Sequence, residues 1–282
     1  MAPLIVIIGQ TASGKSDLAL DIAKSFNGEI ICADSRTIYK GMNIGTAKPG
    51  KKALTVIQHH LLDIIEPDQT FTAADFKQLA VKAINNIDSR GKLPILVGGT
   101  GLYIDGVIFD YAFMPPVETE EREQLQQLSV EQLQQKLAAQ GIGLPENKAN
   151  PRHLIRALET NGAVPVKGKF RSNTLMIGIE KSKEELIKNI EVRTADMIVN
   201  GLEAEVKQLA EHYGWQSPGM NAVGYKEWHE YESPVNVERA INQNSLHYAK
   251  RQRTWFKRNP NINWVKNSVE ALRLVKTFIQ HN

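Results

Sequence analysis

A segment of eight residues near the start of the chain has the spacing of a phosphate-binding loop. It matches G-x-x-x-x-G-K-[ST] and consists of Gly9, Gln10, Thr11, Ala12, Ser13, Gly14, Lys15 and Ser16. Glycines let the backbone turn tightly enough for successive N–H groups to point at phosphate oxygens. Lys15 can bring a positive charge to the terminal phosphate, and the Ser16 hydroxyl can ligate Mg²⁺. The segment predicts a site for Mg²⁺ with a diphosphate or longer polyphosphate, without by itself predicting ATP hydrolysis.

Two more side chains that could do chemistry, Asp34 and Thr100, follow predicted strands. Asp34 comes directly after the run 29–33, and Thr100 lies in the glycine-rich segment 98–101 after the run 94–97. Ligands of an open parallel sheet bind beyond the carboxyl ends of its strands, so we expect both residues beside the phosphate-binding loop. A carboxylate there can abstract a proton or support Mg²⁺. Either residue could instead cap a helix, but the expected position in the crevice favours function.

The elements that must position these residues alternate between strand and helix patterns. Residues 4–8 form a continuous, β-branched apolar run, which is typical of a strand buried on both faces. The predicted strands are 4–8, 29–33, 60–65, 94–97 and 174–179, and the predicted helices of this part are 16–26 and 71–87. Strands that alternate with helices indicate a parallel sheet with helices on both faces.

The middle of the chain has a different composition. The pair Pro115-Pro116 precedes a Glu- and Gln-rich helical stretch over 118–140, and helical patterns return over 181–213 and 237–258. The predicted parts are a core over 1–113, a helical insert over 114–150, and a core continuation with a basic helical tail over 151–282. The predicted fold class is α/β: a P-loop NTPase-like parallel sheet flanked by helices, with an inserted helical subdomain and a helical C-terminal tail.

Composition limits the class of protein further. The chain has 282 residues, 42% of them hydrophobic, and 34 Lys and Arg against 31 Asp and Glu give a net charge of +3. No window of about eighteen apolar residues occurs, which argues against a membrane span, and the run 4–8 is too short for a signal peptide. The lone cysteine, Cys32, excludes an intramolecular disulfide and a multi-cysteine zinc site. We expect a cytoplasmic protein with Cys32 in its core.

The segment 244–258 is basic and interleaved with aromatic residues. It holds five cations and no acid, the cations being Lys250, Arg251, Arg253, Lys257 and Arg258. Such a helix suits an RNA backbone and unstacked bases, although a solvated helix face over core aromatics has the same pattern. Arg193 could reach a bound diphosphate or lie exposed on a helix. His59 and His60 would point to opposite faces of a strand, which favours a structural or substrate-contact role over a metal site.

Taken together, these and further segments resemble the tRNA dimethylallyltransferases, also called tRNA isopentenyltransferases. The shared segments, which run in family order over about residues 4–258, are 9–16, 33–35, 39–49, 59–63, 71–76, 97–103, 155–159, 223–225 and 250–255. The phosphate-binding loop is common to many families, whereas the run 41–49 and the paired histidines are far more particular. Two positions depart from the family pattern: Gln10 stands where proline is common, and Asn150-Pro151 stands where Asn-Asp is common. The insert is also short.

The resemblance implies transfer of a dimethylallyl group from dimethylallyl diphosphate to the exocyclic amine of adenosine 37 of a tRNA, next to the anticodon. Mg²⁺ and the phosphate-binding loop would hold the diphosphate, with Lys15 on the leaving group. Asp34 would be the general base, and Thr100 would orient the reacting groups. The implied contacts to the tRNA anticodon stem-loop are Asp34, Ser35, Arg36, Thr37, Thr100, Arg122, Arg152, His153, Leu154, Ile155 and Arg156, to which the basic segment adds Arg251 and Arg253. We expect a monomer.

Two alternatives stay open at this point. A P-loop kinase or an isopentenyltransferase could act on free adenine nucleotides, but such an enzyme has little use for the insert and the basic segment. A catalytically idle RNA-binding module has no need of Lys15, Ser16, Asp34 and Thr100 together.

Overall fold

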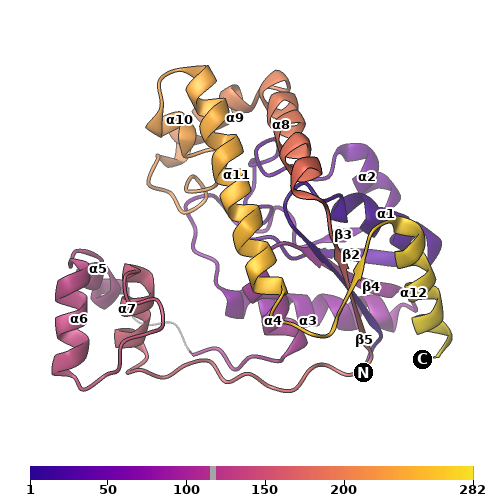
Figure 1. Cartoon of the computed structure of the whole chain (residues 1–282), viewed down its shortest axis with the longest axis horizontal. Helices are drawn as coiled ribbons and strands as arrows, with labels where there is room; N and C mark the ends of the chain where they lie inside the picture. The colour runs from indigo at the N-terminus through magenta and orange to yellow at the C-terminus, as the bar shows by residue number, and fades with distance from the viewer. Residues whose placement is uncertain (115–118, 282) are drawn as a thin grey trace. The chain divides into compact units, whose positions relative to one another are not determined.

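A single parallel sheet organises the chain, in a computed structural model that describes residues 1–114 and 119–281 (Figure 1). Its strand order is β3-β2-β4-β1-β5-β6, and every pairing is parallel. The strands are β1 Leu4–Gly9, β2 Gly28–Cys32, β3 His59–His60, β4 Leu93–Gly98, β5 Thr174–Ile179 and β6 Ile262–Val265. The predicted sheet is therefore confirmed, and β1 lies inside it between β4 and β5.

The central strands are buried on both faces because helices cover the sheet on either side. All six residues of β1 and all six of β4 are buried, which explains why their sequences are apolar without alternation. Ile5 and Ile7 face a cluster that includes Ile22 of α1 (Lys15–Ser25) and Val275 of α12 (Ser268–Gln280). On the other face, α3 (Ala73–Ser89) packs against α4 (Gly101–Ile108).

A second group of helices forms its own core beyond the loops that follow the strands. These helices are α8 Lys183–Val199, α9 Leu202–Tyr213, α10 Glu227–Glu230 and the long α11 Pro234–Phe256. A further short helix, α2 (Lys51–Val56), lies apart from this group and precedes β3. Buried members of this core include Met42, Val206 and Tyr225. The helix α11 contacts α8, α4 and β1, so it passes over the point where β1 gives way to the phosphate-binding loop.

The chain divides into two compact units, of which residues 1–108 and 171–282 form one and residues 109–170 the other. The helices of the unit 109–170 are α5 Thr119–Gln126, α6 Val130–Ala139 and α7 Pro151–Glu159. Their shared core contains Leu125, Leu133, Leu137, Leu154 and Ile155. The unit thus starts before and ends after the predicted insert 114–150, because α7 packs against α5 and α6. Pro115 and Pro116, expected as its entry, lie outside the described residues.

Two predicted elements differ from the structure. The predicted strand 60–65 is wrong beyond its start, because Leu61 and Asp63 adopt left-handed conformations with φ of 62° and 52° that end β3 after two residues. The C-terminal part is not helical throughout, since β6 returns to the sheet edge before α12.

Within the described residues, no helix is long and apolar enough to cross a membrane.

Candidate active site

The phosphate-binding loop lies between β1 and α1, as predicted. Gly14 takes the left-handed conformation, φ 87°, immediately before the first turn of α1, where glycine adopts it without steric cost. The side chain of Ser13 lies against Gly9, because a Cβ added to Gly9 would come within 2.5 Å of Ser13 Oγ. Ser13 Oγ is buried and has no hydrogen-bond partner among the described residues. An anion in the loop would give this hydroxyl a partner.

Lys15 and Arg193 bring two cations to this loop. Burial lowers the pKa of Lys15 to about 8; the charge of Asp34 opposes this shift, and Arg193 adds to it. Burial also lowers the pKa of Arg193, again against the effect of Asp34. Arg193 Nε is buried without a hydrogen-bond partner within the described part of the chain. Arg193 is thus half-buried beside Lys15 and Asp34 rather than fully exposed on its helix, and its contact with a diphosphate remains a prediction.

Asp34 and Thr100 lie on neighbouring loops, as the order of β2 and β4 requires. Thr100 Oγ1 accepts a hydrogen bond from Ser35 N at 3.0 Å, and Thr100 N donates to the Ala33 carbonyl at 3.3 Å. The loops approach this closely because Gly98 has no Cβ: one would lie 1.9 Å from the Ala33 oxygen. The predicted convergence of the two loops is confirmed.

Neither residue caps a helix with its side chain, the alternative left open by the sequence. Asp34 Oδ1 accepts from Arg36 N at 2.8 Å and so fixes a turn rather than a helix. Thr100 starts α4 through its backbone carbonyl, which accepts from the N–H groups of Tyr103 and Ile104. The Thr100 hydroxyl instead holds the segment that carries Asp34.

Arg36 and Thr37, in the same segment, are hydrogen-bonded to other parts of the chain. Arg36 Nη1 donates to the Pro218 carbonyl at 3.0 Å. Thr37 is buried, and its hydroxyl donates to the Asp34 carbonyl at 3.4 Å. These contacts fix the conformation of the loop, whereas the implied contacts to RNA remain predictions.

Two side chains of α11 to which the sequence analysis gave no role in the catalytic site also reach it. Gln252 Oε1 accepts from Thr11 N at 2.7 Å, and Gln252 Nε2 donates to the Gly99 carbonyl at 3.0 Å. The Tyr248 hydroxyl lies close enough to Thr100 and to Gln252 for both side chains to lower its pKa. A signal for Gln252 exists in the sequence, because its spacing from Ser245 and Ala249 places it on the buried stripe of the helix.

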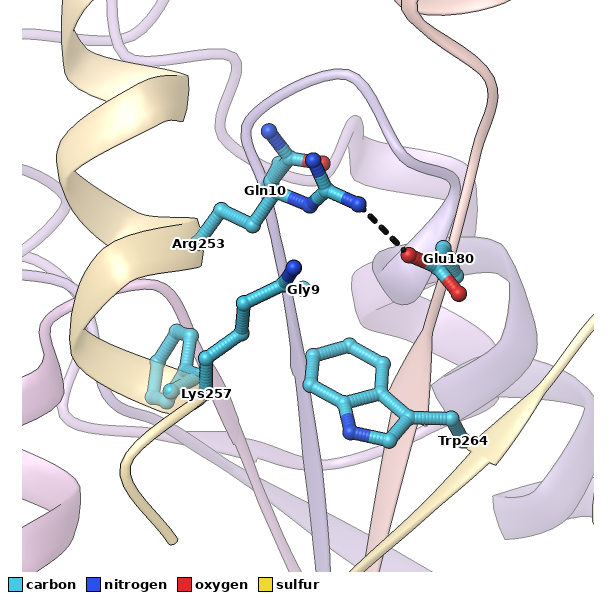
Figure 2. Close-up of a pocket in the computed structure, with 7 residues that line it drawn as sticks. Gly9, Gln10, Glu180, Arg253, Lys257 and Trp264 are labelled. Atoms are coloured by element: carbon cyan, nitrogen blue, oxygen red, sulfur yellow. Dashed lines mark hydrogen bonds and ion pairs between the residues drawn. The ribbon is translucent and has the colours of Figure 1, made fainter.

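A small cavity adjoins the start of the phosphate-binding loop (Figure 2). It has a volume of about 240 Å³ and is lined by Gly9, Gln10, Glu180, Arg253, Phe256, Lys257 and Trp264. Arg253 Nη2 donates to Glu180 Oε1 at 3.0 Å across it. The charge of Arg253 is therefore paired with that of Glu180, and its contact with RNA remains a prediction.

Arg251, the other predicted cation of α11, is exposed. Its guanidinium carbon lies 5.7 Å from the centre of the Tyr248 ring. Its guanidinium is in no ion pair with another residue within 1–114 and 119–281. Arg251 therefore keeps a charge available to a phosphate.

In the helical unit, two predicted RNA contacts serve the unit itself. Arg122 and Arg156 bind the two oxygens of the buried Glu159 side chain at 2.7 and 3.1 Å. Leu154 and Ile155 are buried in the core of the unit, so their side chains are not available for a contact with RNA, a correction to the sequence analysis. Arg152 and His153 are exposed on the first turn of α7.

The residues present fit Mg²⁺ only in company with a phosphate ligand. Ser16 lies exposed at the start of α1, yet no group of three or more His, Cys, Asp or Glu side chains within the described residues could hold a metal ion. Mg²⁺ commonly takes few protein ligands when phosphate oxygens and water supply the rest.

The paired histidines are structural: His60 Nε2 lies 2.7 Å from Glu29 Oε2, and His59 Nδ1 lies 2.8 Å from the Ile57 oxygen.

Comparisons with known proteins show which proteins this chain resembles. A family model described as IPP transferase matches residues 37–259. A tRNA dimethylallyltransferase of Staphylococcus saprophyticus is 40% identical over 96% of this chain and 94% of its own length. The solved structure of a tRNA isopentenylpyrophosphate transferase from Bacillus halodurans is 33% identical, covers 100% of this chain and 96% of its own, and has a TM-score of 0.77. The corresponding enzyme of Staphylococcus epidermidis is 35% identical, with a TM-score of 0.74 and coverage of 100% and 99%.

Proposed function

Because the chain belongs to the IPP transferase family, that of the tRNA dimethylallyltransferases, we propose that it transfers a dimethylallyl group to the exocyclic amine of adenosine 37 in tRNA. Dimethylallyl diphosphate is the donor, and pyrophosphate is released. The observation that carries this proposal is the juxtaposition of two groups: a phosphate-binding loop with Lys15 and Arg193, and a carboxylate, Asp34, within range of their charges.

The loop binds the diphosphate of the donor. Its backbone N–H groups and the N-terminus of α1 attract an anion, and Ser13 Oγ and Arg193 Nε are buried groups that lack partners in the described chain. Mg²⁺ bound through Ser16 and the diphosphate would neutralise further charge on the leaving group. Lys15 and Arg193 stabilise the negative charge that grows on the pyrophosphate as it leaves.

Asp34 acts on the acceptor. The lone pair of the adenine amine forms a bond to the allylic carbon of the donor, and the bond between that carbon and the diphosphate oxygen breaks with its electrons on the oxygen. The amine then sheds a proton to Asp34. A carboxylate helps because the amine lone pair is delocalised into the purine ring and is a poor nucleophile. Thr100 holds the Asp34 segment through Ser35 N.

The adenine reaches this site by leaving the stack of the anticodon loop. A base inside a stack cannot present its amine to a carboxylate at the end of a sheet, so the enzyme takes it flipped out. The exposed cations Arg251 and Arg152, with His153, contact the phosphates of the anticodon stem-loop. The groups assigned to both substrates come from one chain, so we propose that the enzyme is a monomer, and a tRNA substrate favours a cytoplasmic location.

Incubation with labelled dimethylallyl diphosphate tests the proposal. Equal amounts of unmodified tRNA, AMP and ATP are offered in separate reactions, each with Mg²⁺ and each with EDTA. We expect label only in tRNA, at adenosine 37, and only with Mg²⁺. Label in AMP or ATP, or transfer of phosphate instead of the prenyl group, contradicts the proposal.

A further inference from the structure

One side chain of α11 joins the two loops of the site. Gln252 is 4% exposed, and its amide is bonded on both sides: the oxygen accepts from Thr11 N at 2.7 Å and the nitrogen donates to the Gly99 carbonyl at 3.0 Å. Thr11 belongs to the phosphate-binding loop, whereas Gly99 precedes Thr100. The amide thus spans the gap between the loop after β1 and the loop after β4.

The fit around this amide is tight. A Cβ added to Gly99 would lie 2.0 Å from Gln252 Nε2, so only glycine leaves room for the amide at that position. Exchange of the amide's oxygen and nitrogen would set its nitrogen against the Thr11 N–H and its oxygen against the Gly99 carbonyl. The orientation of Gln252 is therefore fixed by both loops at once.

Tyr248, one turn earlier on α11, extends the bridge to the residue that holds Asp34. Its hydroxyl lies close enough to Gln252 and to Thr100 for both side chains to lower its pKa, and Thr100 in turn accepts from Ser35 N. Burial, with the negative charge of Asp34, raises the pKa of Tyr248 to about 12. The hydroxyl therefore stays protonated at neutral pH and does not serve as a base.

The reaction depends on the separation that this bridge spans. The leaving diphosphate is held by one loop and the proton acceptor by the other, and the attacking amine must meet the allylic carbon in line between them. A misplacement of about 1 Å can cost about 100-fold in rate. We infer that Gln252 and Tyr248 are positioning residues that fix the phosphate-binding loop relative to the Asp34 loop, an inference that rests on the proposed prenyl transfer.

Single-turnover kinetics of three variants test this role. Gln252→Ala removes the bridge, Tyr248→Phe removes only the hydroxyl, and Gln243→Ala is a matched control, since Gln243 is an exposed glutamine on the same helix. With enzyme in excess over tRNA and saturating donor, we expect rates about 10- to 100-fold lower for Gln252→Ala and Tyr248→Phe. The dissociation constants for dimethylallyl diphosphate and for tRNA, measured separately, should stay within about threefold, and Gln243→Ala should match the parent.

A purely structural role gives a different pattern. It would lower the melting temperature while the folded variant reacted at the parental rate, and that result overturns the inference. Gln252→Glu supplies a test if Gln252→Ala does not fold, because it keeps the shape and the acceptor for Thr11 N but loses the donor to Gly99. A parental rate for a folded Gln252→Glu also overturns the inference.

A double variant separates one bridge from two independent contacts. If Gln252 and Tyr248 act through the same network, Gln252→Ala with Tyr248→Phe should be about as slow as the slower single variant. If the fold-losses in rate of the two single variants multiply in the double variant, the two residues act independently, and that result contradicts a shared bridge. Failure of the proposed function is recognised separately, because the parent enzyme would then leave tRNA unlabelled.

Discussion

Asp34 has one carboxylate oxygen committed to its own turn, which makes a clean test of its chemistry possible. Oδ1 accepts from Arg36 N at 2.8 Å, and an asparagine retains an oxygen that can accept this bond. Asp34→Asn should therefore keep the loop in place while removing the proton acceptor. We expect the single-turnover rate to fall by about 10²- to 10⁴-fold with tRNA affinity nearly unchanged. A parental rate would exclude Asp34 as the general base.

Lys15 predicts a pH dependence of donor binding. Its pKa is lowered to about 8, mainly by burial. The free enzyme therefore loses the positive charge of Lys15 as the pH rises through about 8. Only the protonated amine attracts a diphosphate strongly, so the dissociation constant for dimethylallyl diphosphate should rise by about tenfold per pH unit above about pH 8. Isothermal titration between pH 7 and 9.5 measures it. Lys15→Arg should flatten the profile, and a flat profile for the parent contradicts the assignment.

At the scale of elements, the family-specific run 41–49 owes its shape to a distant carboxylate. Glu205, on α9, accepts hydrogen bonds from the N–H groups of Asn43, Ile44 and Gly45, and the Tyr225 hydroxyl donates to it at 2.7 Å. Gly45 is required here because a Cβ would meet the Tyr225 ring at 2.4 Å. One side chain therefore accepts the backbone hydrogen bonds of a loop that has no regular secondary structure.

Loss of this anchor should destabilise the fold. Glu205→Ala leaves three N–H groups and a buried tyrosine hydroxyl without their acceptor, and we expect the free energy of unfolding in urea to fall by about 2–4 kcal/mol. Glu203→Ala, two residues earlier, removes only an exposed pair with Lys207 and should cost less than about 1 kcal/mol. Equal losses for the two variants would show that the loop does not depend on Glu205.

The same elements show which features a sequence can predict. β1 and β4 were predictable because strands buried on both faces are continuously apolar. β6 was not, since Ile262–Val265 is an edge strand with two exposed residues in its middle. The loops around Lys15, Asp34 and Thr100 were predictable because parallel topology brings strand ends together. Gln252 was missed because its role depends on where α11 crosses β1, which local pattern does not encode.

At the scale of the whole molecule, the boundary between units was only partly predictable. The proline pair and the Glu- and Gln-rich stretch marked the helical insert, but the unit extends over 109–170. Nothing in the local composition of α7 indicates that Leu154 and Ile155 pack with α5 and α6 rather than with the core. The same packing explains why apolar members of the implied RNA-binding segment are buried while Arg152 stays exposed.

Charge at this scale gives a prediction that separates two neighbouring arginines. The net charge is only +3, so affinity for RNA depends on individual exposed cations rather than on an overall field. Arg251 is unpaired within the described chain, whereas Arg253 binds Glu180 at 3.0 Å. A cation that displaces one counterion from a phosphate contributes close to one unit to the slope of log K against log salt.

Arg251→Gln should therefore make the slope of log K for tRNA binding against log salt less steep by about one unit. Arg253→Gln should change this slope clearly less, because Glu180 already offsets the charge of Arg253. Binding titrations of tRNA between about 50 and 200 mM salt measure both slopes, with the prenyl donor absent so that chemistry does not interfere. Glu180→Gln is the reciprocal control: it frees Arg253 and should raise the slope if Arg253 lies within reach of the RNA. Unchanged slopes for all three variants would place the RNA away from this end of α11.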